Sequence, residues 1–250
     1  MLLQCGMDGG AAREEAQLAA ACLRAETLES VAELNELGLA LLGEQAAGAG
    51  SQAAPLLHEV GALWRRLDAA ARRRAAACPY LLLDGGFADR ERWRAPPAAQ
   101  VAEPAGAAGA PFFTVPGTVE AARLLFIYAW HLARAESAAA RLLLGMPPGC
   151  AAAIGACTLR HIHTLAEQHP EWLRPRWLAH PALWRELLCA ADSGETRALE
   201  RARLHGLTML AAEARLGGAA PLPHGPGGGA APALQARRPR ATRPPGYRRM

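Results

Sequence analysis

Apolar residues recur at helical spacing between proline and glycine stops along most of this chain. In residues 28–47, Leu34, Leu37 and Leu41 fall on one face of a helix. A similar apolar stripe, with arginines on the opposite side, predicts a second helix over residues 55–77. Because Ala and Leu greatly outnumber the strand-favouring Val, Ile and Thr, we expect an all-α fold.

The segment after this second helix predicts a change of local structure. Cys78-Pro79 should stop the helix, and YLLLDGG should supply a short extended piece and a glycine turn before one more helical turn near Trp93. Further on, caps and prolines place the other helix starts, with Asp192 and Glu195 expected to form a capping box. These helices are predicted over residues 118–144, 149–157, 158–168, 181–191 and 192–216.

A stretch of small residues and prolines interrupts the helical pattern near the middle of the chain. Residues 95–111, APPAAQVAEPAGAAGAP, contain four prolines and little surface that could be buried. They are typical of a linker between domains. We therefore predict five parts, namely a lead segment (1–26), a first helical domain (27–94), a linker (95–116), a second helical domain (117–216) and a tail (217–250).

The positive charge of the chain is concentrated in the tail. No lysine occurs, so all 27 basic residues are arginines, and six of them lie beyond residue 217 without any acid. Subtracting this +6 from the net charge of +4 leaves residues 1–216 at −2. We expect a disordered, low-complexity tail that attracts nucleic acid only non-specifically.

A faint repeat relates the two predicted domains. At an offset of 91, Pro79 corresponds to Pro170 and Trp93 to Trp184, and two further leucine and alanine pairs agree. An internal duplication would produce this pattern. A coincidence between two helical pieces that both end at a proline would produce it as well, so both interpretations stay open.

Several classes of protein are disfavoured by what the sequence contains. Its six cysteines are scattered singly, which favours a reducing compartment, and we expect a cytoplasmic protein without a signal peptide. The apolar run 124–132 is too short to cross a bilayer. Catalytic and phosphate-binding motifs are not apparent. We therefore expect no enzymatic activity, no cofactor, no membrane association and no small-molecule substrate.

The second predicted domain, residues 117–216, has a recognisable order of elements. A long first helix is followed by a Thr-Leu to Leu-Ala-Glu helix and a helix-turn-helix-like end. The residues that carry this pattern are Ala139, Leu144, Gly145, Met146, Thr158, Leu159, Leu165, Ala166, Glu167, His205, Met209 and Leu210. In this order and at these residues the domain resembles the FlhD family of flagellar transcriptional regulators.

This resemblance implies a helical dimer or oligomer that works with a zinc-containing FlhC-like subunit to bind promoter DNA and activate transcription. The chain departs from the family at Leu173, where a cysteine that can bridge subunits is typical, and in its additional N-terminal half and tail. It would thus be a divergent relative. The alternative is a helical adaptor that keeps the dimerising scaffold, binds another protein and does not contact DNA.

One face of the last predicted helix carries the candidate contact residues. Arg197, Arg201 and His205 follow one another at four-residue spacing, which suits contact with DNA phosphates or with a partner. The alternative is a solvated face on which these arginines pair with Glu195 and Glu200, where ion pairs contribute little.

Two other groups of residues invite a functional interpretation. The nearly all-apolar segment 124–130 predicts an oligomer interface through Phe126, Trp130 and Ala133. Cys157 and His161 offer zinc-ligand types, but their neighbour His163 would diverge around the helix, so we predict no metal site. The tryptophans at 172, 177 and 184 are predicted to be core anchors rather than platforms for nucleic-acid bases.

Overall fold

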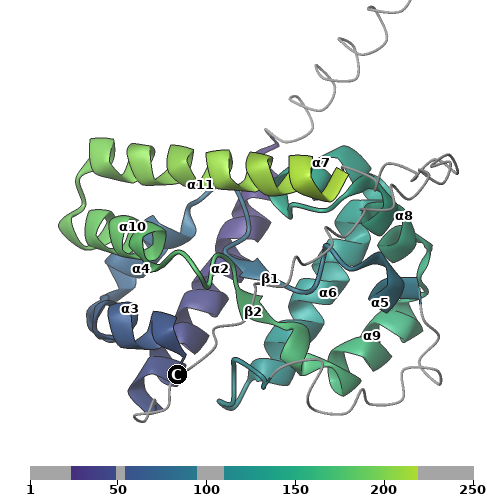
Figure 1. Ribbon diagram of the computed structural model, residues 1–250, viewed down its shortest axis with the longest axis horizontal. Helices are drawn as coiled ribbons and strands as arrows, with labels where there is room; N and C mark the ends of the chain where they lie inside the picture. The colour runs from purple at the N-terminus through teal and green to yellow at the C-terminus, as the bar shows by residue number, and fades with distance from the viewer. Residues whose placement is uncertain (1–23, 49–53, 95–109, 219–250) are drawn as a thin grey trace, which may run out of the picture. The chain divides into compact units, whose positions relative to one another are not determined.

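Helices make up most of the described chain, which comprises residues 24–48, 54–94 and 110–218 of the computed structural model (Figure 1). The first part contains α2 (Ala25–Gly48), α3 (Pro55–Arg66), α4 (Ala69–Ala76), β1 (Leu83–Asp84) and α5 (Arg90–Arg94). The second part contains α6 (Thr118–Ala135), α7 (Ser137–Leu143), α8 (Pro148–Ala156), α9 (Leu159–Gln168), the 3-10 turn η1 (Pro170–Trp172), β2 (Arg174–Pro175), α10 (Pro181–Ser193) and α11 (Thr196–Gly218). The predicted helical fold class is confirmed.

Two of the predicted long helices are each broken into two, so their expected extents were wrong. The helix over 55–77 breaks because the Asp68 carboxylate accepts a hydrogen bond from the backbone N–H of Ala71 at 2.6 Å and starts α4 anew. The helix over 118–144 breaks at Glu136, because the backbone φ of this residue, −145°, is not helical. Glu136 instead forms an ion pair with Arg24.

The predicted capping box at Asp192 is also wrong. Helix α10 continues through Asp192 and ends at Gly194, whose φ of +70° is the left-handed conformation that glycine adopts easily at a helix end. The Asp192 carboxylate points to α3 instead and forms an ion pair with Arg66 at 2.7 Å. By contrast, the predicted start of α9 is confirmed, because Thr158 accepts a hydrogen bond from the N–H of His161 at 3.2 Å.

Residues 25–94 and 118–193 repeat one order of elements, which we call the first and the second repeat. Each repeat has a long helix, shorter helices that pack on it (α3 and α4 in the first repeat; α7, α8 and α9 in the second), a two-residue strand and a final helix. The strands begin at residues 83 and 174 and the final helices at residues 90 and 181, so both differences equal 91. The offset that the strands and the final helices share supports the duplication over a coincidence of sequence.

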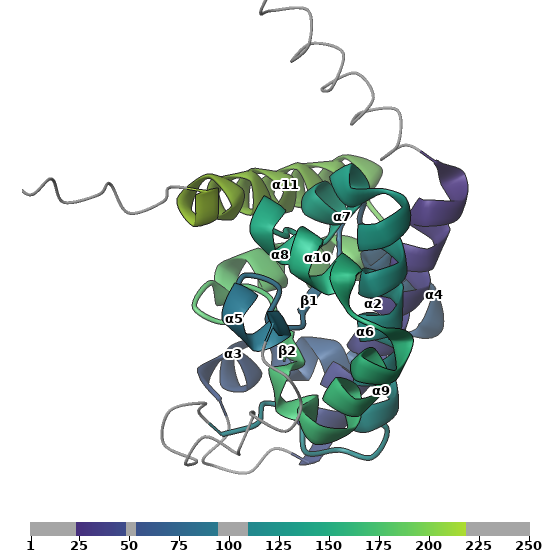
Figure 2. The ribbon, with the colours of Figure 1, turned by 90° about the vertical axis from the view of Figure 1, so that its right-hand side faces the viewer.

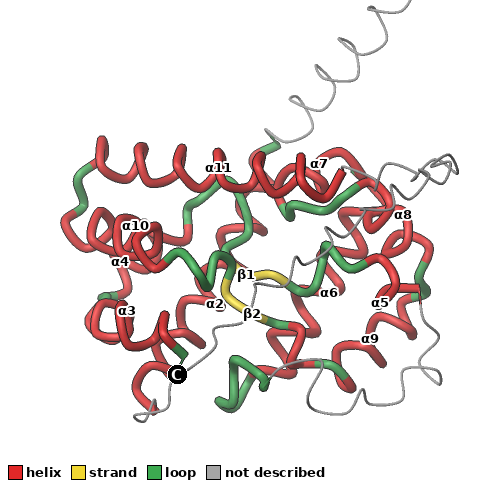
Figure 3. Tube along the Cα trace, in the orientation of Figure 1, coloured by secondary structure: helices red, strands yellow, loops and turns green. Residues whose placement is uncertain are grey.

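The two strands pair with each other at the junction of the repeats, as the yellow segments of Figure 3 show. They are antiparallel, with Leu83 opposite Pro175 and Asp84 opposite Arg174. Subtracting the offset from the second strand turns Pro175 into position 84 and Arg174 into position 83. Position 83 of the first strand is thus opposite the equivalent of position 84, and position 84 is opposite the equivalent of position 83. A local twofold axis between the strands produces this reciprocal pairing.

The final helices are exchanged between the repeats. Helix α10 of the second repeat packs on α3 and α4 of the first, and α5 of the first repeat packs on α8 of the second. In Figure 1 the green α10 accordingly lies among the blue helices, and the blue α5 lies among the teal ones. The turned view in Figure 2 again places α5 beside α8.

One hydrophobic core therefore contains side chains from both predicted domains, and all described residues belong to one compact unit. The predicted separation into two helical domains does not match this packing, because each repeat lacks a final helix of its own over its core. The end of the predicted linker is also packed, with Phe113 buried. The lead segment up to residue 23, residues 95–109 and the tail from residue 219 lie outside the described residues.

Candidate partner-binding site

The last helix, α11, has a buried side and a fully outward side. Its buried residues Leu199, Ala202, Gly206 and Leu210 recur at spacings of three and four, which places them on one face against the body. The residues on the opposite side are exposed and are separated by alternating steps of four and three. We call this set the outer seam, and it consists of Arg197, Arg201, Leu204, Thr208 and Ala211.

Leu204 is the most unusual residue of the outer seam. It leaves 63% of its surface exposed, the largest value for a large apolar side chain in the described chain. Leu207, one helical turn further and to one side, is 37% exposed. The spacing of the seam is that of the contacting positions of a coiled-coil helix, so the face has the form of one half of a helix pair.

The helix that carries the outer seam is fixed by contacts of its buried side with the first repeat. A Cβ atom added at Gly206 would lie 1.9 Å from the hydroxyl oxygen of Tyr80, so the backbone of α11 rests directly on this buried ring. Arg203 donates a hydrogen bond to the backbone oxygen of Arg74 in α4 at 3.0 Å. These contacts fix the rotation of the helix and therefore the direction in which Leu204 points.

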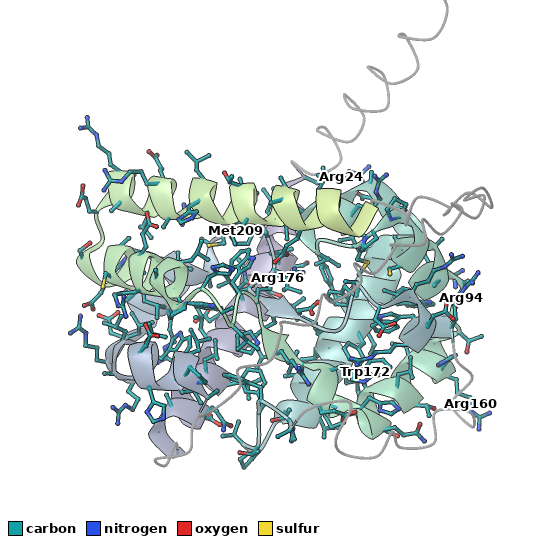
Figure 4. The ribbon with its side chains drawn as sticks, viewed as in Figure 1. Arg24, Arg94, Arg160, Trp172, Arg176 and Met209 are labelled. Atoms are coloured by element: carbon teal, nitrogen blue, oxygen red, sulfur yellow. The ribbon has the colours of Figure 1, made fainter. Side chains whose placement is uncertain are left out.

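A buried arginine supports the C-terminal half of α11 (Figure 4). The guanidinium of Arg176 donates to the backbone oxygens of Leu81, at 2.9 Å, and Leu144. Its remaining nitrogen lies 3.5 Å from a carboxylate oxygen of Glu213 on α11. Burial raises the pKa of Glu213, and the nearby Arg176 charge opposes that rise. Arg176 thereby ties both repeats to α11, a role that its position among prolines and tryptophans did not indicate from sequence.

Two of the three predicted contact residues lie on the outer seam. Arg197 and Arg201 are exposed and form no ion pair with a described residue, so the expected pairing with Glu195 and Glu200 is not found among them. His205 is exposed too, but its Nδ1 lies 3.0 Å from a carboxylate oxygen of Glu186 on α10. Sequence spacing identified the arginines but missed Leu204, although it lies three positions after Arg201.

The predicted oligomer interface is wrong for two of its three residues. Phe126 is completely buried within the chain, where its ring meets those of Trp93 and Trp172, and Ala133 is buried as well. The helices of the same chain cover the apolar faces for which the sequence predicts a partner subunit. Trp130 is only partly buried, and its indole donates to the backbone oxygen of Cys157 at 2.8 Å.

The structure also bears on the predicted tryptophan anchors, on metal ligands and on membrane-spanning helices. Trp172, Trp177 and Trp184 are buried, which confirms the prediction of core anchors. No three metal-ligating side chains come together within the described ranges. None of the helices described has both the length and the apolar content that crossing a membrane requires.

Comparisons with protein-family models, with curated proteins and with solved structures find no match for this chain. The outer seam therefore has to be interpreted from its own chemistry. It offers an exposed leucine, two small side chains and two guanidinium groups on one rigid helix, which suits the binding of another helix.

Proposed function

We propose that this chain is a regulatory subunit, of the FlhD-like kind, that binds a partner protein through the outer seam of α11. The observation that carries the proposal is the 63% exposure of Leu204 on a helix whose opposite side is anchored to both repeats. Burying a leucine that is otherwise in water contributes about 1.5–3 kcal/mol, so a partner helix would gain from covering it.

The charges of the outer seam define the partner. Arg197 and Arg201 have no carboxylate partner among the described residues, and the five seam positions include no acid. An amphipathic helix with an apolar stripe and acidic flanks complements this face. The seam runs for about 21 Å at 1.5 Å per residue, which matches four turns of such a helix. An FlhC-like subunit is the partner that the family resemblance proposes.

The helical part of this chain carries too little positive charge to bind DNA well alone, so DNA binding would require a complex. Residues 1–216 carry a net charge of −2, which gives little general attraction for phosphates. Arg197 and Arg201, which form no ion pair among the described residues, would add only local contacts to a duplex. We therefore propose that a more basic partner supplies most of the affinity for promoter DNA. This chain binds that partner through its outer seam.

Co-purification of the full chain from its native host tests the proposal. Leu204→Glu should remove the partner, because a charge would have to be buried at the centre of the interface. Leu142→Glu is the matched control, since Leu142 on α7 is also an exposed leucine, at 42%, but lies outside the outer seam. Recovery of the same partner by wild type and by both variants would overturn the proposal.

The adaptor alternative is separated from the regulator by DNA mapping on the same complexes. A regulator requires that the wild-type complex enriches discrete DNA sites, whereas an adaptor requires only that the partner is recovered. Because Arg197 and Arg201 would face the acidic flanks of the partner, the double variant Arg197→Ala and Arg201→Ala should weaken recovery of the partner and lose the discrete DNA sites with it. A wild-type complex that contains a partner but enriches no DNA would reject the regulator and leave the adaptor.

A further inference from the structure

The exchange of final helices places buried aromatic side chains of each repeat against the other repeat. On one side, Trp184 of α10 meets Trp64 of α3 with ring centroids 5.4 Å apart. On the equivalent side, the ring of Trp93, at the same position of α5, meets Phe126 at 5.1 Å. Both tryptophans are buried, so each repeat completes the core of the other.

Polar contacts follow the same reciprocal plan. Arg74 of the first repeat donates to the backbone oxygen of Ala191 at 2.7 Å, which satisfies the C-terminal end of α10. In the other direction, the thiol sulfur of Cys157 in the second repeat lies 3.5 Å from the backbone oxygen of Trp93 and 3.3 Å from that of Ala153. The exposed pair Arg185 and Glu59, at 3.1 Å, adds a contact between α10 and α3.

The backbone continues this connection through the centre. The N–H of Leu81 donates to the oxygen of Leu143, and the N–H of Arg176 donates to the oxygen of Leu82, both at 2.9 Å. Separation of the repeats would thus expose two tryptophans and break a strand pair and several backbone hydrogen bonds. Such losses are typical of an obligate subunit interface rather than of a loose domain contact.

We propose that the surface between the repeats is a self-association surface of the kind found in homodimers, and that its natural alternative partner is the complementary repeat of a second copy of this chain. The local twofold register of β1 and β2 and the reciprocal exchange of α5 and α10 carry this inference. The covalent connection normally favours pairing within one chain, because it keeps the local concentration of the partner repeat high.

A cleavable version of the full chain tests this proposal without requiring either repeat to fold alone. The recognition site of a sequence-specific protease replaces residues 100–106, between the described repeats. After cleavage of the folded protein, the two halves should remain together in gel filtration at the mass of the uncut chain. Separation of the halves under native conditions, whether they stay folded or not, would overturn the proposal.

The second measurement asks whether the halves accept a partner from another copy. Cut protein with an affinity tag on its first half is mixed with isotope-labelled cut protein, unfolded together and refolded. The tagged first halves should then carry labelled and unlabelled second halves in equal amounts. Refolded first halves that carry no second half would also reject the inference.

A matched pair of tryptophan variants locates the association. Trp184→Ala in the second half should weaken recombination of the cut halves about tenfold or more, because it removes a central buried aromatic anchor. Trp130→Ala is the control, since the Trp130 indole bonds to Cys157 within its own repeat. Equal recombination of both variants would show that the exchanged helix does not hold the halves together.

Discussion

Trp64 of α3 and Trp184 of α10 pack edge to face across the boundary between the two repeats, with their ring planes at 72°. Neither ring has a large companion of its own repeat in an aromatic contact among the described residues. The pair is central to a core that neither half could enclose alone. The stability of the first repeat therefore depends on a residue 120 positions further along the sequence.

We expect both repeats to unfold in a single cooperative transition. Trp184→Ala should lower the free energy of unfolding by about 3–5 kcal/mol, since it removes a fully buried aromatic side chain. Urea unfolding followed by circular dichroism and by tryptophan fluorescence measures this change, and the two signals should coincide. Two separate transitions in the wild type would contradict the prediction.

The buried amide of Asn35 provides a second test. Its Nδ2 donates to the backbone oxygens of Ala76 and Tyr80 at 3.0 and 2.8 Å, and its Oδ1 accepts from the N–H of Leu82 at 2.7 Å. Asn35→Leu keeps much of the volume but leaves these three backbone groups without partners. It should cost about 3 kcal/mol or more of unfolding free energy.

Gln45→Ala is the control for this amide, because Gln45 makes similar bonds to Thr114 at the surface. Water can replace those bonds, so the loss should stay below about 1 kcal/mol. A comparable loss in both variants, measured by chemical denaturation, would show that burial of the Asn35 network is unimportant.

Much of the local structure could be predicted from the sequence because its causes are local. Thr158 as a cap and Pro181 as the first residue of α10 are decided by neighbours within one turn, and the structure confirms both. The break at Asp68 was missed because an arginine-rich helical stripe continues past it, while its side chain forms a cap that spacing alone does not reveal.

The partner of an apolar face could not be predicted in the same way. Periodicity showed that Phe126 must be buried, but it does not say against what. The surface that covers it comes from Trp93, which lies in the other repeat, and from Trp172. Likewise, the exposure of Leu204 depends on how Tyr80 and Arg203 fix the rotation of α11, and these contacts are far apart in sequence.

The close approach of α11 to Tyr80 predicts a strong effect of one added methyl group. Gly206→Ala should destabilise the protein by about 2 kcal/mol or more, because the new Cβ would overlap a buried ring that cannot move freely. Gly43→Ala in α2 is the matched control, since its nearest neighbour is the backbone oxygen of Trp64 at an ordinary 3.7 Å. That variant should gain about 0.5–1 kcal/mol. Thermal unfolding of both variants decides the sign, and a neutral Gly206→Ala would contradict the placement of α11.

The buried thiol of Cys78 predicts a dependence on alkaline pH. Burial raises the pKa of Cys78 from its ordinary 9.0 to about 11, so the folded chain holds this proton more tightly than the unfolded chain. The resulting stability is complete below about pH 9 and is lost as the pH rises through about 11. Cys78→Ala should flatten this alkaline decrease of unfolding free energy, and an unchanged slope would contradict it.

The burial of Cys78 also predicts that it reacts more slowly with a thiol reagent than an exposed cysteine does. A thiol reagent attacks the thiolate, which the buried Cys78 does not form at about pH 8. Cys189 is exposed on α10 and should be labelled first of these two. Peptide mapping after brief labelling of the native protein measures both sites, and early modification of Cys78 would show that it is accessible.

The tail and the helical body are two separable sources of nucleic-acid binding. All six arginines beyond residue 217 lack a compensating acid, whereas the preceding part carries a net charge of −2. Removal of residues 219–250 should therefore abolish weak binding to random DNA.

With six phosphate contacts, the affinity of the full chain should fall with a logarithmic salt slope of about −5 between about 50 mM and about 200 mM salt. The double variant Arg197→Ala and Arg201→Ala, which keeps the tail, should retain most of this binding, since a face of two arginines adds few contacts. Fluorescence anisotropy with a random duplex measures all three proteins. Equal affinity of the truncated and full chains at low salt would move the basic site from the tail to the helical body, where Arg197 and Arg201 would become its first candidates.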